Sequence, residues 1–139
     1  SAPSGTAMTL IVDASVAAKW LFDEIGSAEA HAIAERPDLV APEFLMLECH
    51  HILWKRYRRQ ETTWAAVIEL QVGLQLAFET FFPDADLRPR AVELSLSHSL
   101  AIYDCLYIAL ARSQRAPLIT ADDRQFAAAR KAGVEVEML

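Results

Sequence analysis

The sequence lacks the features that mark membrane-spanning, secreted and repetitive proteins. No apolar run in its 139 residues is long enough to cross a bilayer. Its opening residues have neither the basic start nor the apolar stretch of a signal peptide. No internal repeat, low-complexity tract or linker interrupts the chain. We therefore expect one globular domain with no membrane contact.

Cysteine is scarce and forms no recognisable framework. Cys49 and Cys105 both lie within stretches that we expect to be helical. Two histidines follow Cys49, but adjacent residues on a helix point in different directions, so this cluster does not suit zinc. Two isolated cysteines and the missing signal peptide indicate reduced thiols and a cytoplasmic protein.

The chain does contain enough apolar residues for a core. Hydrophobic residues make up 53% and charged residues 23% of the composition, which is typical of a folded domain. Residues 1–7 look like the remnant of an expression tag before Met8, so we expect the domain to cover 8–139. The net charge of −6 argues against a protein that simply coats nucleic acid. It is compatible with an enzyme whose acidic pocket binds divalent cations.

Short apolar runs alternate with helical patterns along the chain. The runs predict strands near residues 9–12, 39–41, 80–82, 117–120 and 134–136. Periodicity and capping residues predict helices near 14–22, 25–34, 43–59, 64–76, 83–98, 99–113 and 122–132. Strands that alternate with helices indicate an α/β sandwich around a small, mostly parallel sheet.

Two aspartates closely follow buried strands. Asp13 comes directly after Thr9-Leu10-Ile11-Val12, and Asp122 follows Leu118-Ile119-Thr120-Ala121. Ligands of α/β sheets bind at the carboxyl ends of the strands, where both side chains would lie. Either aspartate could instead serve only as the N-cap of the helix that follows.

Glu48 interrupts a helix face that otherwise predicts core. It shares this face with Leu45 and Ile52. A buried carboxylate is costly unless a cation, a metal or a hydrogen-bond donor compensates it. Glu48 could alternatively form a surface pair with Lys55 or Arg56.

Asp104 has the same anomalous place in the next apolar helix. It falls on one stripe with Tyr107, Ile108 and Ala111. Its position near the helix start allows a second interpretation, in which it only interacts with the positive end of the helix dipole.

The four carboxylates Asp13, Glu48, Asp104 and Asp122 make a stronger case together than singly. If they were gathered without matching bases, they would repel one another and raise each other's pKa. Oxygen ligands without His or Cys spacing suit Mg²⁺ or Mn²⁺. Such ions activate water and neutralise charge on a phosphoryl group. The set therefore predicts metal-assisted phosphodiester hydrolysis.

The acidic motifs are similar in order and spacing to those of the PIN-domain ribonucleases. In particular, the chain resembles the VapC-type toxins of VapBC toxin–antitoxin pairs, from Met8 to its end. The segments that carry the resemblance are Val12-Asp13-Ala14-Ser15, Pro42 with Glu48, Tyr103–Ala111, and Thr120-Ala121-Asp122 followed by Phe126 and Gly133-Val134.

The resemblance implies a three-layer α/β/α domain that acts as an endoribonuclease dependent on Mg²⁺ or Mn²⁺. It implies that the metal-binding and catalytic residues are Asp13, Glu48, Asp104 and Asp122. It makes Ser15 and Thr120 hydroxyls that orient carboxylates. It further implies an RNA substrate, a homodimer and a cognate antitoxin that covers the site.

His51 departs from the family pattern. Many relatives carry an asparagine three residues after the helix glutamate, where this chain has His51. The histidine could contact the surroundings of Glu48 or make the site pH-sensitive. Asp123, beside Asp122, could assist the site or merely face solvent.

Two other functions are open on the sequence alone. One is a non-catalytic RNA- or protein-binding module with a vestigial acidic pocket. The other is a metal-dependent phosphatase, although no second acid lies two residues after Asp13, as it would in the haloacid dehalogenase type.

Two surface features suggest partners. The stretch Trp64–Phe78 carries apolar residues on more than one face, which predicts contact with a second protomer or an antitoxin helix. The basic run Lys55–Arg59 predicts a solvated helix end or, alternatively, a contact with RNA phosphates or an acidic partner segment.

Overall fold

One parallel sheet forms the centre of the computed structural model, which describes residues 9–22 and 25–139. Its strands are β1 (Leu10–Val12), β2 (Leu39–Pro42), β3 (Thr80–Phe82), β4 (Leu118–Thr120) and β5 (Val136–Met138). Every neighbouring pair is parallel, and the order is β3-β2-β1-β4-β5. The expected small parallel sheet is confirmed, with β1 in the middle. The expected tag remnant and Met8 lie outside the described residues.

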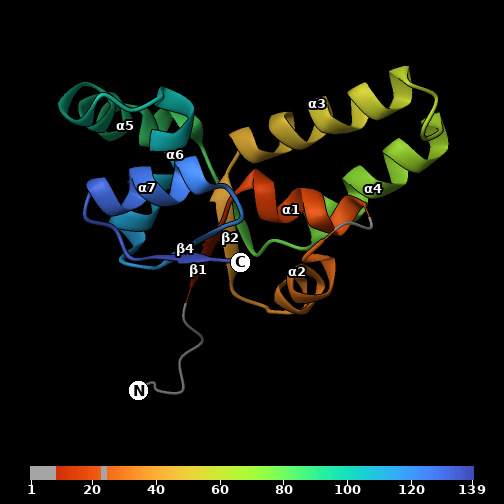
Figure 1. The fold of residues 1–139 in the computed structure, drawn as a ribbon, viewed down its shortest axis with the longest axis horizontal. Helices are drawn as coiled ribbons and strands as arrows, with labels where there is room; N and C mark the ends of the chain where they lie inside the picture. The colour runs from red at the N-terminus through yellow and green to blue at the C-terminus, as the bar shows by residue number, and fades with distance from the viewer. Residues whose placement is uncertain (1–8, 23–24) are drawn as a thin grey trace.

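Helices cover both faces of this sheet. They are α1 (Ala14–Leu21), α2 (Ser27–Ala34), α3 (Phe44–Arg58), α4 (Trp64–Leu76), α5 (Asp84–His98), α6 (Ile102–Gln114) and α7 (Asp123–Lys131). Figure 1 shows α1–α4 on one side of the sheet and α5–α7 on the other. Right-handed crossovers explain the division, since connections toward β3 and connections toward β5 place their helices on opposite faces. The chain is therefore the expected α/β/α sandwich.

The three inner strands β1, β2 and β4 and the helix α6 form the centre of the core. β1 and β4 are buried along their whole lengths, as parallel strands covered on both faces must be. α6 packs against β1, β2 and α5, and all its residues from Asp104 to Ala111 are buried. No single helix in the described part of the chain is long and apolar enough to cross a membrane. The helices α5 and α6 reach the required length and apolar character only when they are taken together, and the chain bends by 116° between them.

Three elements start two or three residues later than expected, for backbone reasons. α2 starts after Gly26 rather than at Ile25, because Gly26 is left-handed with φ 86°. α6 starts at Ile102 rather than Ser99, because Ser99, with φ 54°, ends α5. β5 starts two residues late, because the backbone N–H of Val134 is used to close α7 by donating to Ala129.

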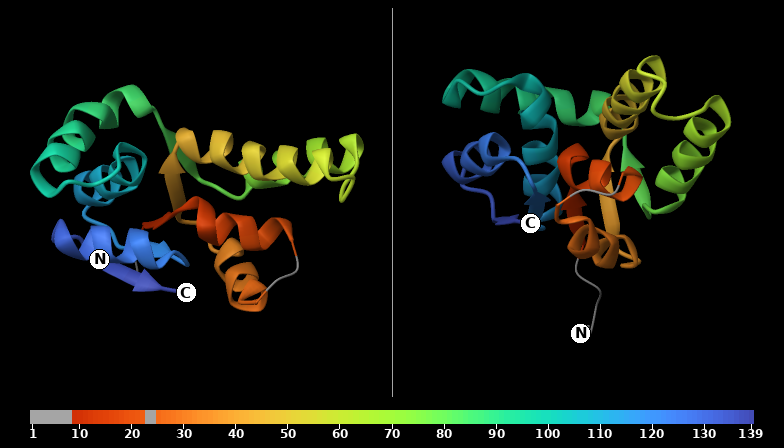
Figure 2. Two further views of the ribbon diagram at one scale, coloured as in Figure 1. Left: turned by 45° about the horizontal axis from the view of Figure 1, so that its top comes forward. Right: turned by 45° about the vertical axis from the view of Figure 1, so that its right-hand side comes forward.

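α3 and α4 project beyond the sheet as a pair of packed helices (Figure 2). Thr63 caps α4 by accepting a hydrogen bond from the backbone N–H of Ala66 at 3.1 Å. Cations fill the last turn of α3, where they stabilise the negative end of its dipole. This pair carries one wall of the candidate site and most of the exposed apolar surface described below.

Candidate active site

Asp13 lies at the carboxyl end of β1 and also caps α1. Its Oδ1 accepts hydrogen bonds from the backbone N–H groups of Ser15 at 3.1 Å and Val16 at 3.3 Å. Only 5% of the residue is exposed. The two interpretations of Asp13 from sequence are thus compatible, because the cap places the carboxylate at the sheet edge where ligands bind.

Two hydroxyls join Asp13 to the end of β4. Ser15 Oγ donates to Oδ1 of Asp13 and Thr120 Oγ1 donates to its Oδ2, each at 2.5 Å. The same hydroxyls accept backbone N–H groups of the β4–α7 turn, from Ala121 at 2.8 Å and from Asp122 at 3.0 Å. The turn that carries Asp122 is therefore tied directly to the carboxylate of Asp13.

Asp122 caps α7 at the same edge of the sheet. Its Oδ1 accepts a hydrogen bond from the backbone N–H of Arg124 at 2.9 Å. Asp123 is exposed in the first turn of α7. Of the two adjacent acids, Asp122 is the one that lines the hollow described below.

Glu48 enters the site from α3 and meets α6. It accepts a hydrogen bond from the hydroxyl of Tyr107, a residue that is 3% exposed. Arg56, one of the two cations offered as a surface partner for Glu48, instead contacts Glu61 at 3.5 Å and the ring of Phe22 at 4.0 Å. Glu48 is thus compensated by a buried donor, which the sequence analysis did not identify.

Arg124 of α7 bridges Asp104 and Asp122. Its Nε lies 3.2 Å from Oδ2 of Asp104, its Nη2 donates to Oδ1 of Asp104 at 3.2 Å, and Nη2 lies 3.5 Å from Oδ2 of Asp122. Arg124 was not predicted from the sequence. A signal was present, because a cation in the first turn of a helix opposes the dipole unless acidic partners offset it.

Burial raises the pKa of three carboxyls, and repulsion between acids adds to the rise at two of them. Burial is the main cause at Asp13, at Asp104 and at Glu48, whose pKa rises to about 7. Asp13 and Asp104 raise the pKa of Glu48 further, and Asp122 raises that of Asp104. The hydrogen bond from Tyr107 lowers the pKa of Glu48, and the positive charge of Arg124 lowers the pKa of both Glu48 and Asp104. The four acids therefore form one electrostatically connected group, as is typical of functional sites.

A hollow of about 500 Å³ opens beside this group. It is lined by Ala14, Ser15, Phe44, Leu47, Glu48, His51, Ile52 and Asp122. Asp13 and Asp104 are not part of this lining; Asp104 and Arg124 line a separate hollow of about 260 Å³. His51 does not hydrogen-bond toward Glu48 but stacks on Trp54, with ring centres 5.5 Å apart and planes at 19°.

The donor set fits a hard divalent cation in chemistry but is not closed around one point. Among residues 9–22 and 25–139, no three His, Cys, Asp or Glu side chains form a ready metal-binding group. Each acid is held by a protein donor, namely the two hydroxyls at Asp13, Tyr107 at Glu48 and Arg124 at the other two. All four side chains offer carboxylate oxygens, and the pKa values of Asp13, Glu48 and Asp104 are raised by burial, so added positive charge of the kind that Mg²⁺ or Mn²⁺ carries would stabilise their charged forms.

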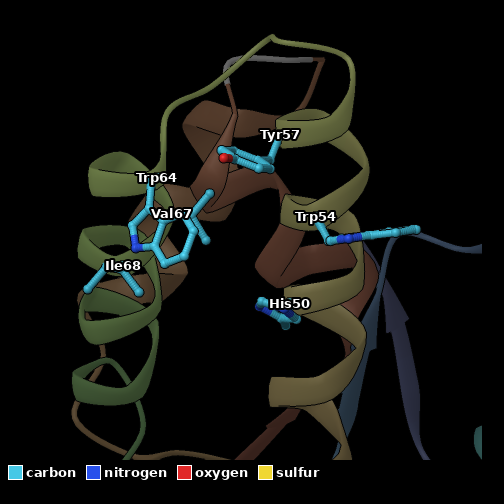
Figure 3. A pocket seen from close by; sticks show the side chains of 6 residues that line it. All are labelled: His50, Trp54, Tyr57, Trp64, Val67 and Ile68. Carbon is cyan, nitrogen blue, oxygen red and sulfur yellow. The ribbon is translucent and has the colours of Figure 1, made fainter.

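A second hollow, of about 250 Å³, lies between α3 and α4 (Figure 3). It is lined by His50, Trp54, Tyr57, Trp64, Val67 and Ile68. On α4, Trp64 is 71% and Leu76 80% exposed, so the expected apolar surface on more than one face is confirmed. Its lining consists of apolar and aromatic side chains together with His50.

Comparisons with known proteins agree on one family. The family model described as PIN domain matches residues 10–132. Ribonuclease VapC3 of Pyrobaculum aerophilum is 30% identical over 124 residues, which cover 86% of this chain and 93% of that protein.

Solved structures of low sequence identity share the fold. The crystal structure of PAE2754 from Pyrobaculum aerophilum has a TM-score of 0.73 at 21% identity and covers 94% of this chain and 83% of its own. A toxin–antitoxin complex from Klebsiella pneumoniae has a TM-score of 0.68 at 17% identity, and the match covers 94% of this chain and 97% of the chain in that structure. Mycobacterium tuberculosis VapC20, a sarcin-ricin loop cleaving toxin, has a TM-score of 0.65 at 18% identity, and the match covers 86% of this chain and 95% of VapC20.

Proposed function

The chain belongs to the PIN-domain family, and from this premise we propose that it is an Mg²⁺- or Mn²⁺-dependent endoribonuclease that acts as the toxin of a toxin–antitoxin pair. The observation that carries the proposal is the connected acid group at the carboxyl ends of β1 and β4. Asp13, Glu48, Asp104 and Asp122 come from four separate elements, yet their charges act on one another. The likeness to Ribonuclease VapC3 supports RNA as the substrate.

Each residue of the group has a defined task in the proposal. Asp13, Glu48, Asp104 and Asp122 would hold the cation. When bound, the cation would supply Lewis acidity for water attack and offset charge on the phosphodiester. Ser15 and Thr120 hold both oxygens of Asp13 in place. Tyr107 fixes one oxygen of Glu48, and its pKa, raised well above the usual value, keeps it a donor.

The proposal includes partners and location. The exposed apolar residues of α4 would be buried by a segment of a cognate antitoxin, which the likeness to a toxin–antitoxin complex supports. The proposal also includes a homodimer and a cytoplasmic location, which membership of the PIN-domain family supports.

RNA cleavage with a matched variant tests the proposal. Purified protein is incubated with a mixed RNA pool and Mg²⁺ or Mn²⁺, beside samples with EDTA and samples of the Asp104→Asn variant. Circular dichroism confirms that the variant is folded. We expect cleavage only by wild-type protein with metal, since the variant loses a ligand charge but keeps the side-chain shape.

A non-catalytic RNA- or protein-binding module is the rival function. It is favoured by one observation, the absence of a ready group of three metal-ligating side chains in the described part of the chain. It predicts RNA or partner binding without cleavage at any metal concentration. Folded wild-type protein that binds RNA and leaves the whole pool intact would support the rival and contradict the nuclease.

A further inference from the structure

α3 has three faces with different surroundings. The first faces the core, where Leu45, Cys49 and Leu53 are fully buried. The second faces α4, and Figure 3 shows Tyr57 pointing toward that helix. The remaining face borders the candidate active site at one end and reaches the tip of the helix pair at the other.

This remaining face, here called the outer face of α3, consists of Glu48, His51, Trp54, Lys55, Arg58 and Arg59. The spacings of three and four residues from Glu48 through His51 and Lys55 to Arg58 place them on one side of the helix. Glu48 and His51 line the hollow of about 500 Å³ at the acid group. Another hollow, of about 360 Å³, lies at the far end.

Stacked rings connect the two ends of the outer face. His51 stacks on Trp54 at 5.5 Å. The guanidinium of Arg58 lies over the same Trp54 ring, 5.0 Å from its centre. Figure 3 shows the side chain of Trp54 directed away from α4, although Trp54 also contributes to the lining of the hollow between α3 and α4. The far hollow is lined only by Trp54, Lys55, Arg58 and Arg59.

The far end of the outer face is unusually basic for this protein. Four of the 13 Lys and Arg residues fall within positions 55–59, although the net charge of the chain is −6. Arg56 belongs to another face, where it contacts Glu61 and Phe22. Lys55, Arg58 and Arg59 are exposed. A polyanion that approaches an acidic site needs such a local cationic surface, since phosphate contacts supply much of its binding energy.

We propose that the outer face of α3 binds the single-stranded RNA substrate on one side of the bond to be cleaved. His51 and Trp54 stack on bases, and Lys55, Arg58 and Arg59 contact phosphates, which is the chemistry that binds single strands without sequence readout. The inference rests on the proposed ribonuclease function and adds the path of the substrate. Glu48 and Arg58 are ten positions apart on a helix, about 15 Å, which accommodates up to about four stacked nucleotides.

Binding of a fluorescently labelled, random-sequence single-stranded RNA tests the path. Anisotropy is measured in EDTA, so that no cleavage occurs, over a series of salt concentrations. The variants are Trp54→Leu and the double variant Arg58→Gln with Arg59→Gln. The matched control replaces Arg88 and Arg90 by Gln on α5, on the other side of the sheet. Thermal melting confirms that all variants fold.

Each variant has its own expected signature. Trp54→Leu weakens binding about 5- to 150-fold with an unchanged salt slope, since one base stack is lost. The double Arg58/Arg59 variant lowers the slope of log affinity against log salt by about 1.4, since two phosphate contacts are lost. The α5 control binds like the wild type.

Three outcomes would overturn the path. If wild-type protein binds and cleaves RNA and both variants bind it equally well, the outer face does not bind the substrate, while the proposed ribonuclease function still holds. Unchanged RNA binding with lost binding of a poly-glutamate peptide would assign the face to an acidic protein segment. Wild-type protein that neither binds nor cleaves RNA would contradict the path and the proposed function together.

Discussion

The hydroxyl of Tyr107 donates a hydrogen bond to Glu48 across 59 residues of sequence. The bond joins α6, in the core, to α3, at the wall of the hollow. Burial raises the pKa of Glu48 to about 7, so that this carboxyl is about half protonated at neutral pH. Cation binding through Glu48 therefore competes with its protonation in the physiological range.

Tyr107→Phe is expected to shift the pH dependence of metal binding to higher pH. The hydrogen bond lowers the pKa of Glu48, so its loss moves that pKa further above its usual value. At pH 7 the variant binds Mn²⁺ more weakly than the wild type, and the difference closes as pH rises. Calorimetric titration at several values from about pH 6 to 9 measures it. An unchanged profile, or a shift to lower pH, would contradict the role of Tyr107.

Glu48→Gln is expected to stabilise the protein at alkaline pH. A carboxyl whose folded pKa is raised contributes stability below its unfolded pKa and loses it as pH rises through the folded value, here from about 4.5 to about 7. Gln carries no charge and avoids this loss. The gain above pH 8 is about 1–2 kcal/mol, because solvent screens the partly exposed group. Urea unfolding at pH 5 and 8.5 measures it, and equal gains at both values would rule out the charge explanation.

Thr120→Val is expected to destabilise the protein by about 1–3 kcal/mol. Thr120 is fully buried and donates to Asp13 while it accepts from the backbone of Asp122. Valine keeps the shape but leaves both partners unsatisfied. Thr120→Ser keeps the hydroxyl and is the matched control. If urea unfolding finds valine no worse than serine, the hydroxyl bridge is not needed for stability.

The fold could be predicted because the inner strands β1, β2 and β4 are short, largely apolar runs that are buried on both faces. β1 and β4 are fully buried, so their sequences contain no competing polar pattern. Helix starts were harder to predict where the structure sets a left-handed residue. Serine has no marked preference for the left-handed conformation that Ser99 adopts, with φ 54°, so the start of α6 was predicted three residues too early.

The candidate acids could be selected because they stand where charge is costly, as Asp104 does in a buried helix. Their catalytic role stays a prediction. Tyr107 could not be singled out, because a tyrosine on an apolar stripe is typical of core, and its bond to Glu48 depends on the packing of α6 against α3. Arg124 could have been predicted, because a cation in the first turn of α7 requires acidic partners.

Arg124→Gln is expected to tighten Mn²⁺ binding at pH 8 by about two- to five-fold. The guanidinium neutralises Asp104 and Asp122 and so competes with an incoming cation. Arg130→Gln changes the same charge on the same helix, away from the acids, and is the control. Calorimetry that finds weaker binding in Arg124→Gln than in Arg130→Gln would show that Arg124 supports the cation rather than competing with it.

The most direct test compares wild-type protein with the Asp122→Asn and Asp123→Asn variants. Mn²⁺ is titrated into each protein, and RNA cleavage is then measured with the same samples. The comparison distinguishes Asp122, a member of the acid group, from its exposed neighbour Asp123. Asn caps a helix as well as Asp does, so both variants keep α7. We expect Asp123→Asn to match the wild type and Asp122→Asn to lose at least about ten-fold in Mn²⁺ affinity and in cleavage. Wild-type affinity and cleavage in Asp122→Asn would contradict a metal-dependent nuclease built on these four carboxylates.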